Sequence, residues 1–297
     1  MSNPTKKDKN DTLTDTFNEI NLKCAPKAKQ KDYTCYTDDS LLKLRNYWNI
    51  RHPDKRINTV EPRQIWNELK TNMSGTCKVE SCWLKQKFVK EKVDKELLEF
   101  TFAPKAPDSW KKNSHEWLSS VDLEKVMKQY EHAYSSFIFI GPSPIDFDSV
   151  KLYGQCVWEE LCNFDLYNYL HSGKTKIGII FNTDPHYKGG SHWISLFINI
   201  KKKFIYFFDS NGNKVPNEIK SFIERVKLQG NQIGIDFNVM SNYPLEHQKS
   251  ESECGMYSLY LIIQLLTNRK QPETFSKVRI SDEEVFNLRH EYFNDIL

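Results

Sequence analysis

The first hundred residues place apolar side chains at helical spacing. Leu41 and Leu44 begin one such series, a second follows Pro62, which can occupy the first position of a helix, and a third covers residues 82–100. Together these series predict a small helical arm domain over residues 32–100.

The segments on either side of the arm domain lack a clear apolar period. Residues 1–31 are rich in Lys, Asp, Asn and Thr, and we expect a flexible tail there. Residues 101–110 carry two prolines and predict a rigid linker or an extended strap. A helix over 119–134, a breaker-rich loop at 141–148 and a helix at 157–170 are expected to follow.

After Gly173 the pattern changes to short apolar runs rich in β-branched and aromatic residues, which are typical of strands. Three lysines make a tight turn between the second and third runs, so that pair is expected to form a hairpin. An amphipathic helix that ends at Gly230 and a strongly apolar helix that begins after Cys254 complete the pattern. We predict an α+β fold with a central mixed sheet flanked by helices. The four strand candidates are residues 176–184, 192–200, 203–211 and 233–242.

Composition narrows the class of protein. The chain has 297 residues, of which 39% are hydrophobic and 27% charged, as in a globular protein with a real core. A net charge of +3 is too small to indicate nucleic-acid binding by itself. No stretch approaches the roughly 20 apolar residues that a membrane helix needs, and no secretory signal is visible. We therefore expect no membrane association and no secretion.

The chain has seven cysteines, an odd number. In a long chain without a secretory signal this favours reduced thiols and a reducing compartment over a disulfide framework. Cys24, Cys35, Cys77 and Cys82 leave a zinc site conceivable, although no CxxC pair is present. Structural thiols are the alternative for these four, and Cys156 and Cys162 are expected to be structural.

Cys254 stands at the predicted start of the apolar helix, where the partial positive charge of a helix N-terminus stabilises a thiolate. The predicted hairpin would bring His192, which begins one strand, beside Asp209, which ends the next. A base oriented by an acid next to a thiol is the constellation of a cysteine hydrolase. Gln248 can supply an oxyanion donor, and Gly255 leaves room for a substrate backbone.

These residues resemble the ubiquitin-like-protein protease and adenovirus endopeptidase group of cysteine proteases. The order His192, Asp209, Gln248, Cys254 matches that group, whereas papain-like enzymes place the cysteine first in the chain. Three details match: a tryptophan after the histidine, an acid that ends the next strand ("FFDSNG"), and a glutamine six positions before a "CG". From about residue 102 onward, the similarity is strongest to the polyprotein-processing proteases of large DNA viruses, such as African swine fever virus and mimivirus-like giant viruses.

The resemblance implies an adenain-type protease domain over residues 101–297 that needs no cofactor or metal. It also implies cleavage after Gly-Gly in viral structural polyproteins during virion maturation, hence a location in the virion and the host cytoplasm. Tryptophans commonly roof the narrow Gly-Gly tunnel in this group. Trp193 and Trp117 match those positions, although Ser119 and Ser120 replace the usual polar pair after Trp117.

Other interpretations remain open at this point. The same site would serve an enzyme that removes SUMO or ubiquitin from proteins, and a binding protein could retain the fold without catalysis. Some viral proteases of this group use nucleic acid as an activator, but the charge of this chain does not indicate one. Asp184 and His186 could replace the acid or the base, but they lack the strand-edge placement of the first set. His247 adjoins Gln248 and could contact substrate.

Overall fold

The structure is a computed structural model, and it describes residues 23–28 and 31–294. Most of the predicted tail, residues 1–31, therefore lies outside the described residues. Ala25 belongs to the described part of that segment. It is buried, and its N–H donates a hydrogen bond to the carbonyl oxygen of Thr101 at 3.1 Å.

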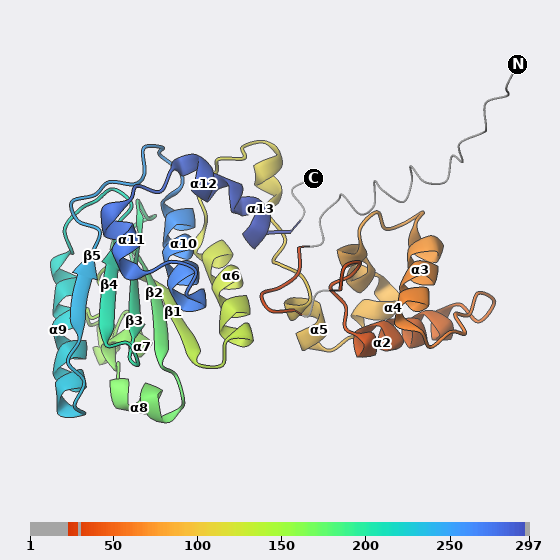
Figure 1. The fold of residues 1–297 in the computed structure, drawn as a ribbon, viewed down its shortest axis with the longest axis horizontal. Coiled ribbons are helices and arrows are strands. Elements are labelled where there is room, and N and C mark those ends of the chain that lie inside the picture. The colour runs from red at the N-terminus through yellow and green to blue at the C-terminus, as the bar shows by residue number, and fades with distance from the viewer. Residues whose placement is uncertain (1–22, 29–30, 295–297) are drawn as a thin grey trace, which may run out of the picture. The chain divides into compact units, whose positions relative to one another are not determined.

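The described chain forms two compact units, whose elements are labelled in Figure 1. The first unit holds the residues before Ala106 together with Phe293 and Asn294, and the second runs from Ala106 to Tyr292. Every candidate catalytic and substrate-binding residue named above belongs to the second unit, whereas the four cysteines considered for zinc belong to the first.

The first unit is helical. Two of its helices follow the expected apolar series, α2 (Asp38–Arg51) and α3 (Pro62–Met73), and Pro62 occupies the first turn of α3. The third series is not one helix but three short ones, η1 (Glu80–Lys85), α4 (Lys87–Lys90) and α5 (Lys95–Phe100). The expected continuous helix is wrong because Gln86 is extended and Asp94 caps a new helix by accepting a hydrogen bond from the Leu97 N–H.

The core of the first unit is aromatic, and it surrounds one buried carboxylate. Trp66 and Trp83 lie in this core, and Glu80 is 5% exposed beside them. The Glu80 carboxylate accepts hydrogen bonds from the Trp66 indole N–H and the Thr34 hydroxyl, each at 2.7 Å. These bonds satisfy a charge that would otherwise be costly to bury.

The expectation of reduced thiols is wrong for six of the seven cysteines. The Cα atoms of the three pairs lie 5.3, 5.5 and 6.3 Å apart, within the range that a disulfide spans. The four sulfurs that we considered for zinc are bonded to one another in pairs, and Cys254 is the free cysteine of the chain. The disulfides are Cys24–Cys35, Cys77–Cys82 and Cys156–Cys162.

The second unit is built on a mixed five-stranded sheet with the order β1-β2-β3-β4-β5. The two outer pairs, β1–β2 and β4–β5, are parallel, and the inner pairs β2–β3 and β3–β4 are antiparallel. This confirms the predicted α+β class, the mixed sheet and the hairpin. The strands are β1 (Phe137–Pro144), β2 (Lys176–Asn182), β3 (Trp193–Asn199), β4 (Phe204–Phe208) and β5 (Asn238–Ser241).

Strand β1 was not expected, because its second half reads as a loop in the sequence. Gly141, Pro142 and Pro144 are breakers, yet they extend a strand whose pairing with β2 shifts register between Ile140 and Ser143. Proline cannot donate to a sheet, and an edge strand such as β1 tolerates it. The predicted loop at 141–148 is therefore strand in its first half.

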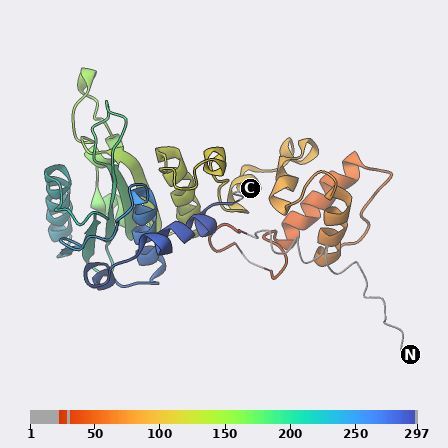
Figure 2. The ribbon, with the colours of Figure 1, turned by 90° about the horizontal axis from the view of Figure 1, so that it is seen from above.

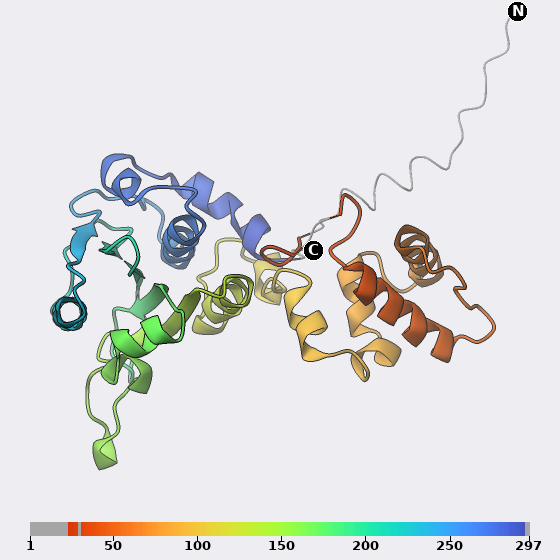
Figure 3. The ribbon, with the colours of Figure 1, turned by 60° about the horizontal axis from the view of Figure 1, so that its bottom comes forward.

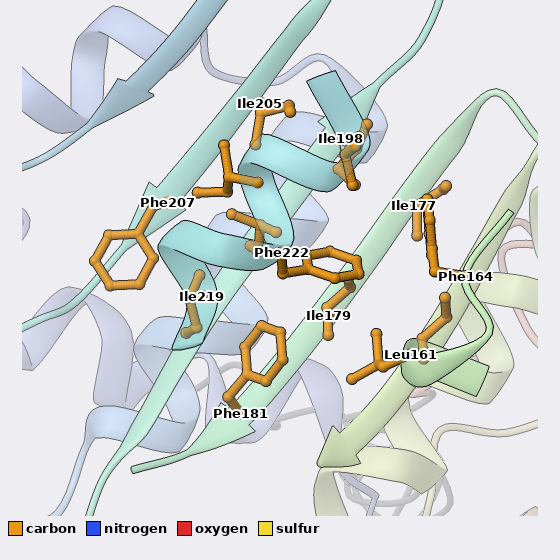
Figure 4. Close-up of a cluster of buried hydrophobic side chains, with 14 of the residues drawn as sticks. Leu161, Phe164, Ile177, Ile179, Phe181, Ile198, Ile205, Phe207, Ile219 and Phe222 are labelled. Atoms are coloured by element: carbon orange, nitrogen blue, oxygen red, sulfur yellow. The ribbon is translucent and has the colours of Figure 1, made fainter. Parts of the chain in front are cut away.

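Helices cover both faces of the sheet. Helix α9 (Asn217–Gln232) lies on one face, whereas α10 (Cys254–Thr267) and α6 (Ser120–Ala133) lie on the other (Figures 2 and 3). Ile219 and Phe222 of α9 pack among the isoleucines and phenylalanines of that sheet face, as Figure 4 shows. On the opposite face α10 approaches β2 so closely that a Cβ on Gly178 would lie 2.8 Å from Ile262.

Short helices complete the second unit. The predicted helix over 157–170 is broken into α7 (Glu159–Cys162) and α8 (Leu166–His171), because Asp165 caps a new helix through the Asn168 N–H. Within residues 23–28 and 31–294, no helix combines the length and apolar character that crossing a bilayer requires. The remaining elements are η2 (Asp108–Lys111), η3 (Leu152–Gly154), α11 (Pro272–Lys277), α12 (Asp282–Asn287) and α13 (Arg289–Tyr292).

Candidate active site

The β3–β4 hairpin brings an imidazole and a carboxylate together. His192 directly precedes β3 and Asp209 directly follows β4, so the antiparallel pairing places both at one end of the hairpin. His192 Nε2 lies 2.7 Å from Asp209 Oδ1. Because Nε2 is engaged by the acid, the other ring nitrogen, Nδ1, is left to face a third group.

Asp209 is held in its ionised form by its neighbours. It is 4% exposed, and its carboxylate also accepts hydrogen bonds from the Asn211 N–H and the Asn213 amide. Burial raises the pKa of Asp209, but the hydrogen bond and the positive charge of His192 outweigh it and hold that pKa below its usual range. The side chain is therefore an anion that can orient the imidazole.

Cys254 is the first residue of α10, and it is 1% exposed. Burial lowers the pKa of His192, but hydrogen bonds to Asp209 and to the Cys254 sulfur, together with their charges, raise it to about 9. The imidazole is thus protonated at neutral pH and bonds both the carboxylate and the sulfur. An imidazolium and a helix N-terminus both stabilise a thiolate.

Gln248 is fixed by the segment that carries the acid. Its Oε1 accepts a hydrogen bond from the Ser210 hydroxyl at 2.8 Å, and its Nε2 donates to the Ser250 carbonyl oxygen at 2.7 Å. The backbone N–H groups of His247 and Gln248 both donate to the Ser210 carbonyl oxygen. One amide hydrogen of Gln248 remains for another acceptor.

The sequence patterns did not predict two polar residues that lie close to this site in the chain or in space. Asn242 is fully buried and binds the backbone of Asp209 through its side-chain amide. Glu253, the residue before Cys254, forms a buried ion pair with Arg289. In the sequence, each of these two residues is a polar residue inside an otherwise apolar or well-ordered segment. That pattern does not predict which residue each of them contacts.

Trp193 and Gly255 pack against one backbone segment. The Trp193 indole N–H donates to the Leu118 carbonyl oxygen at 2.9 Å. A Cβ on Gly255 would lie 3.0 Å from the Leu118 Cβ and 3.3 Å from Trp193 Cδ1. Glycine at this position makes room for those two side chains, and the expected approach of a substrate backbone over Gly255 stays a prediction.

A pocket of about 650 Å³ opens beside Trp193. Trp117 lines it and is 43% exposed, an unusual exposure for a side chain of that size. Ser119 and Ser120 also line the pocket, and Ser119 caps α6 in a capping box with Asp122. The two tryptophans that we expect to contact substrate therefore line the same pocket.

The remaining histidine and aspartate candidates have other partners than His192, Asp209 and Cys254. His186 pairs with Asp146 at 2.7 Å and, like Asp184, lines the pocket. His247 is fully buried, with its Nε2 bonded to the Phe275 carbonyl oxygen and its Nδ1 accepting the Ile280 N–H. The suggestion that His247 contacts substrate is therefore wrong, because no part of its side chain reaches the surface.

The part of the chain that the structure describes holds no group of three or more His, Cys, Asp or Glu arranged to bind a metal ion.

The sequence beyond Ser172 matches a known catalytic domain. Residues 173–297 fit the sequence model described as the Ulp1 protease family, C-terminal catalytic domain. This segment forms a Ulp1-family protease domain. It contains His192, Asp209, Gln248 and Cys254.

The likeness to relatives extends over most of the length of the chain. A protein of Acanthamoeba polyphaga mimivirus named as a thiol protease is 29% identical, over 92% of this chain and 93% of its own length. A cysteine protease of African swine fever virus is 25% identical, over 82% of this chain and 93% of its own length. These matches identify the chain as a cysteine-type peptidase.

A solved structure confirms the fold. The crystal structure of the African swine fever virus protease superposes with a TM-score of 0.68 at 23% identity, covering 93% of this chain and 98% of the viral protein. The likeness thus includes residues outside the segment matched by the family model.

Proposed function

We propose that this Ulp1-family peptidase is an endopeptidase in which Cys254 is the nucleophile, His192 the general base and acid, and Asp209 the group that orients the imidazole. One observation carries the proposal. His192 is bonded to Asp209 at 2.7 Å through Nε2, and hydrogen bonds with Asp209 and the Cys254 sulfur raise its pKa to about 9 although burial lowers it. A purely structural histidine does not require hydrogen bonds to both an acid and a thiol at a helix N-terminus, whereas a catalytic base requires both.

The geometry supports an acyl-enzyme mechanism. The imidazolium of His192 keeps the Cys254 sulfur as a thiolate, which attacks the scissile carbonyl carbon and forms a tetrahedral intermediate. His192 then donates its proton to the leaving amine, and the peptide bond breaks. In the second half, His192 takes a proton from water, whose oxygen attacks the thioester and releases the acid product and Cys254.

The oxyanion of the intermediate needs donors that are already in place. The backbone N–H of Cys254 lies in the first turn of α10 and has no partner within the helix. Gln248 offers the amide hydrogen that Ser250 does not take. We assign both to the oxyanion hole, where one donor contributes about a hundredfold in rate.

Cleavage after Gly-Gly is our proposal for specificity. Trp117, Trp193 and Gly190 line one pocket, and we propose that the substrate chain passes extended between the two indoles. A substrate with two glycines before the scissile bond fits that space. Because the relatives named as proteases are viral proteins, we propose that the natural partner is a viral structural polyprotein, cut during virion maturation in the virion or the host cytoplasm.

The test uses the full chain and a peptide with the sequence Gly-Gly-Xaa, with Gly-Ala-Xaa as the specificity control. Cys254→Ala should abolish cleavage, and His192→Ala should be about as damaging because the two act as a unit. His171→Ala is the matched control, since His171 is an exposed histidine away from the site. Turnover by Cys254→Ala near the wild-type rate would reject Cys254 as the nucleophile, whereas a wild-type chain that cleaves nothing would favour a non-catalytic binding role.

A second candidate function is the removal of SUMO or another ubiquitin-like protein from its conjugates. A relative from African swine fever virus that is 27% identical to this chain is named a SUMO-1 cysteine protease. Incubation with SUMO and ubiquitin fusions beside candidate core polyproteins, with cut sites determined by mass spectrometry, separates the two. Efficient cleavage of the fusions but not of the polyproteins would replace the first proposal with the second.

A further inference from the structure

The residue before the proposed nucleophile belongs to a buried ion pair. Glu253 precedes Cys254 at the N-terminus of α10, and the side chains of Glu253 and Arg289 are each 1% exposed. Arg289 Nε and Nη2 lie 3.1 and 3.0 Å from Glu253 Oε2, and Nη2 lies 3.2 Å from Oε1. This forked contact joins α13 to the start of α10, 36 residues away in sequence.

A carboxylate in this position creates an electrostatic conflict. The proposed mechanism needs a thiolate at Cys254, and a second negative charge one residue away disfavours it. The conflict is larger in a buried site, where water screens little of the repulsion. The Arg289 guanidinium carries the compensating charge, and two of its nitrogens contact the Glu253 carboxylate.

Arg289 also reaches the wall of the pocket. Its Nη2 donates to the Glu116 carbonyl oxygen at 2.9 Å, directly before Trp117. Its guanidinium lies 4.5 Å from the centre of the Trp110 ring, a distance typical of a cation–π contact. One side chain thus binds both the residue before the nucleophile and the residue before the exposed indole.

Other charged and titratable groups face this pair. His115 Nδ1 lies 3.5 Å from Glu253 Oε1, and its ring stacks on Phe286. The charges of Glu116 and Asp122 act on Arg289, and that of Glu253 acts on Tyr257. Of these groups Arg289 is the permanent cation in direct contact with the carboxylate, because His115 is 60% exposed and lies farther from it.

We propose that Arg289 is a positioning residue of the peptidase site: it neutralises Glu253 so that the Cys254 thiolate forms, and it ties the Trp117 segment to the start of α10. The inference rests on the proposed function, since it matters only if Cys254 reacts as a thiolate.

The test is the pH dependence of Cys254 alkylation by iodoacetamide in the full chain. Arg289→Met leaves the carboxylate unpaired and should raise the midpoint by roughly one pH unit. Glu253→Gln leaves the guanidinium unpaired and should lower it by a similar amount. The double variant Arg289→Met/Glu253→Gln should return the midpoint to within about 0.3 unit of wild type, because neither charge remains.

The opposite signs of the two single variants separate a charge effect from a loss of packing. Arg269→Met is the control, since Arg269 forms an exposed ion pair with Glu291 and should not move the midpoint. Midpoints that move in the same direction in both single variants, or in neither, overturn the inference. If Arg289→Met does not fold, Glu253→Gln decides the question, and an unchanged midpoint in that variant counts against the inference.

The two proposals fail in different ways. A wild-type chain whose Cys254 resists alkylation and that cleaves no Gly-Gly peptide contradicts the proposed function. A wild-type chain that reacts and cleaves, while the Arg289 and Glu253 variants keep its pH midpoint, contradicts the role of Arg289 alone.

Discussion

The side chain of Asn242 holds the backbone of Asp209 by both of its polar groups. Asn242 Oδ1 accepts the Asp209 N–H at 3.0 Å, and Nδ2 donates to the Asp209 carbonyl oxygen at 2.7 Å. Asn242 directly follows β5, and Asp209 directly follows β4. The amide therefore continues the β4–β5 pairing one residue beyond the sheet and sets the position of the carboxylate that faces His192.

Asn242→Ala should lower both stability and activity. The change leaves the buried Asp209 N–H without its partner and removes one of the two hydrogen bonds that the Asp209 carbonyl oxygen accepts, the other coming from the Gly212 N–H. An unpaired buried N–H costs roughly 2 kcal/mol in the free energy of unfolding. Peptide cleavage should fall because Asp209 loses its fixed position. Urea unfolding and kcat/KM check this, with Asn238→Ala, an exposed residue of β5, as the control. An Asn242→Ala enzyme with wild-type kcat/KM would show that Asp209 needs no such support.

Ser210 orients the Gln248 amide through its hydroxyl, which donates to Oε1. Without it the amide can turn over, so Ser210→Ala should lower kcat about tenfold, a part of the roughly hundredfold loss expected for Gln248→Ala. Alkylation of Cys254 by iodoacetamide should keep its wild-type rate, because that reaction uses no oxyanion hole. Kinetics of the two single variants and the double variant check this. Effects that multiply in the double variant would mean that Ser210 does not act through Gln248.

Activity should decline on the alkaline side as His192 loses its proton. The pKa of His192 is raised to about 9 by Asp209 and Cys254 despite burial, so kcat/KM should fall as pH rises through about 9. Asp209→Asn removes the charge that raises this pKa, so the alkaline limb should move to lower pH. A pH profile of kcat/KM for both enzymes is the measurement. An Asp209→Asn profile with an unchanged alkaline limb would contradict the coupling.

The same pKa makes stability depend on pH. The pKa of His192 in the folded chain, about 9, lies above the ordinary value of 6.5. The contribution of protonated His192 to the free energy of unfolding is therefore complete below about pH 6.5 and is lost as pH rises through about 9. At about 1.4 kcal/mol for each pH unit, the loss amounts to roughly 3 kcal/mol. Urea unfolding at pH 6 and pH 9.5 should show it in the wild type and not in His192→Gln. A loss of equal size in His192→Gln would assign it to other groups.

Trp117→Ala should weaken substrate binding without weakening the fold. Trp117 is 43% exposed and lines the pocket, so its removal deletes a contact for the substrate but little of the core. We expect KM to rise about tenfold or more for a Gly-Gly-Xaa peptide, since a buried indole contact contributes 1 to 3 kcal/mol or so. Steady-state kinetics measure this. Tyr187→Ala, at a more exposed aromatic residue that does not line the pocket, is the control and should keep KM unchanged.

The elements that the sequence predicted well have a strong local period. Helix α10 begins at Cys254 as expected, and the apolar run that follows it is buried through Leu266. The β3–β4 hairpin needs only two alternating runs and a short turn, so it also follows from neighbours in the chain. The order of His192, Asp209, Gln248 and Cys254 suggested the family, and the family model and the relatives support that resemblance.

The sequence alone was enough to place a cysteine at the start of a buried helix and a histidine opposite an aspartate, because these features depend on residues close together in the chain. Only the tertiary structure decided that Arg289 faces Glu253, that Asn242 supports Asp209, that six cysteines are paired, and that Gly141 to Pro144 belong to a strand. In the first two pairs the residues are 36 and 33 positions apart in the chain. Their contacts depend on how whole elements pack, and a helical or strand period carries information only about a residue's own element.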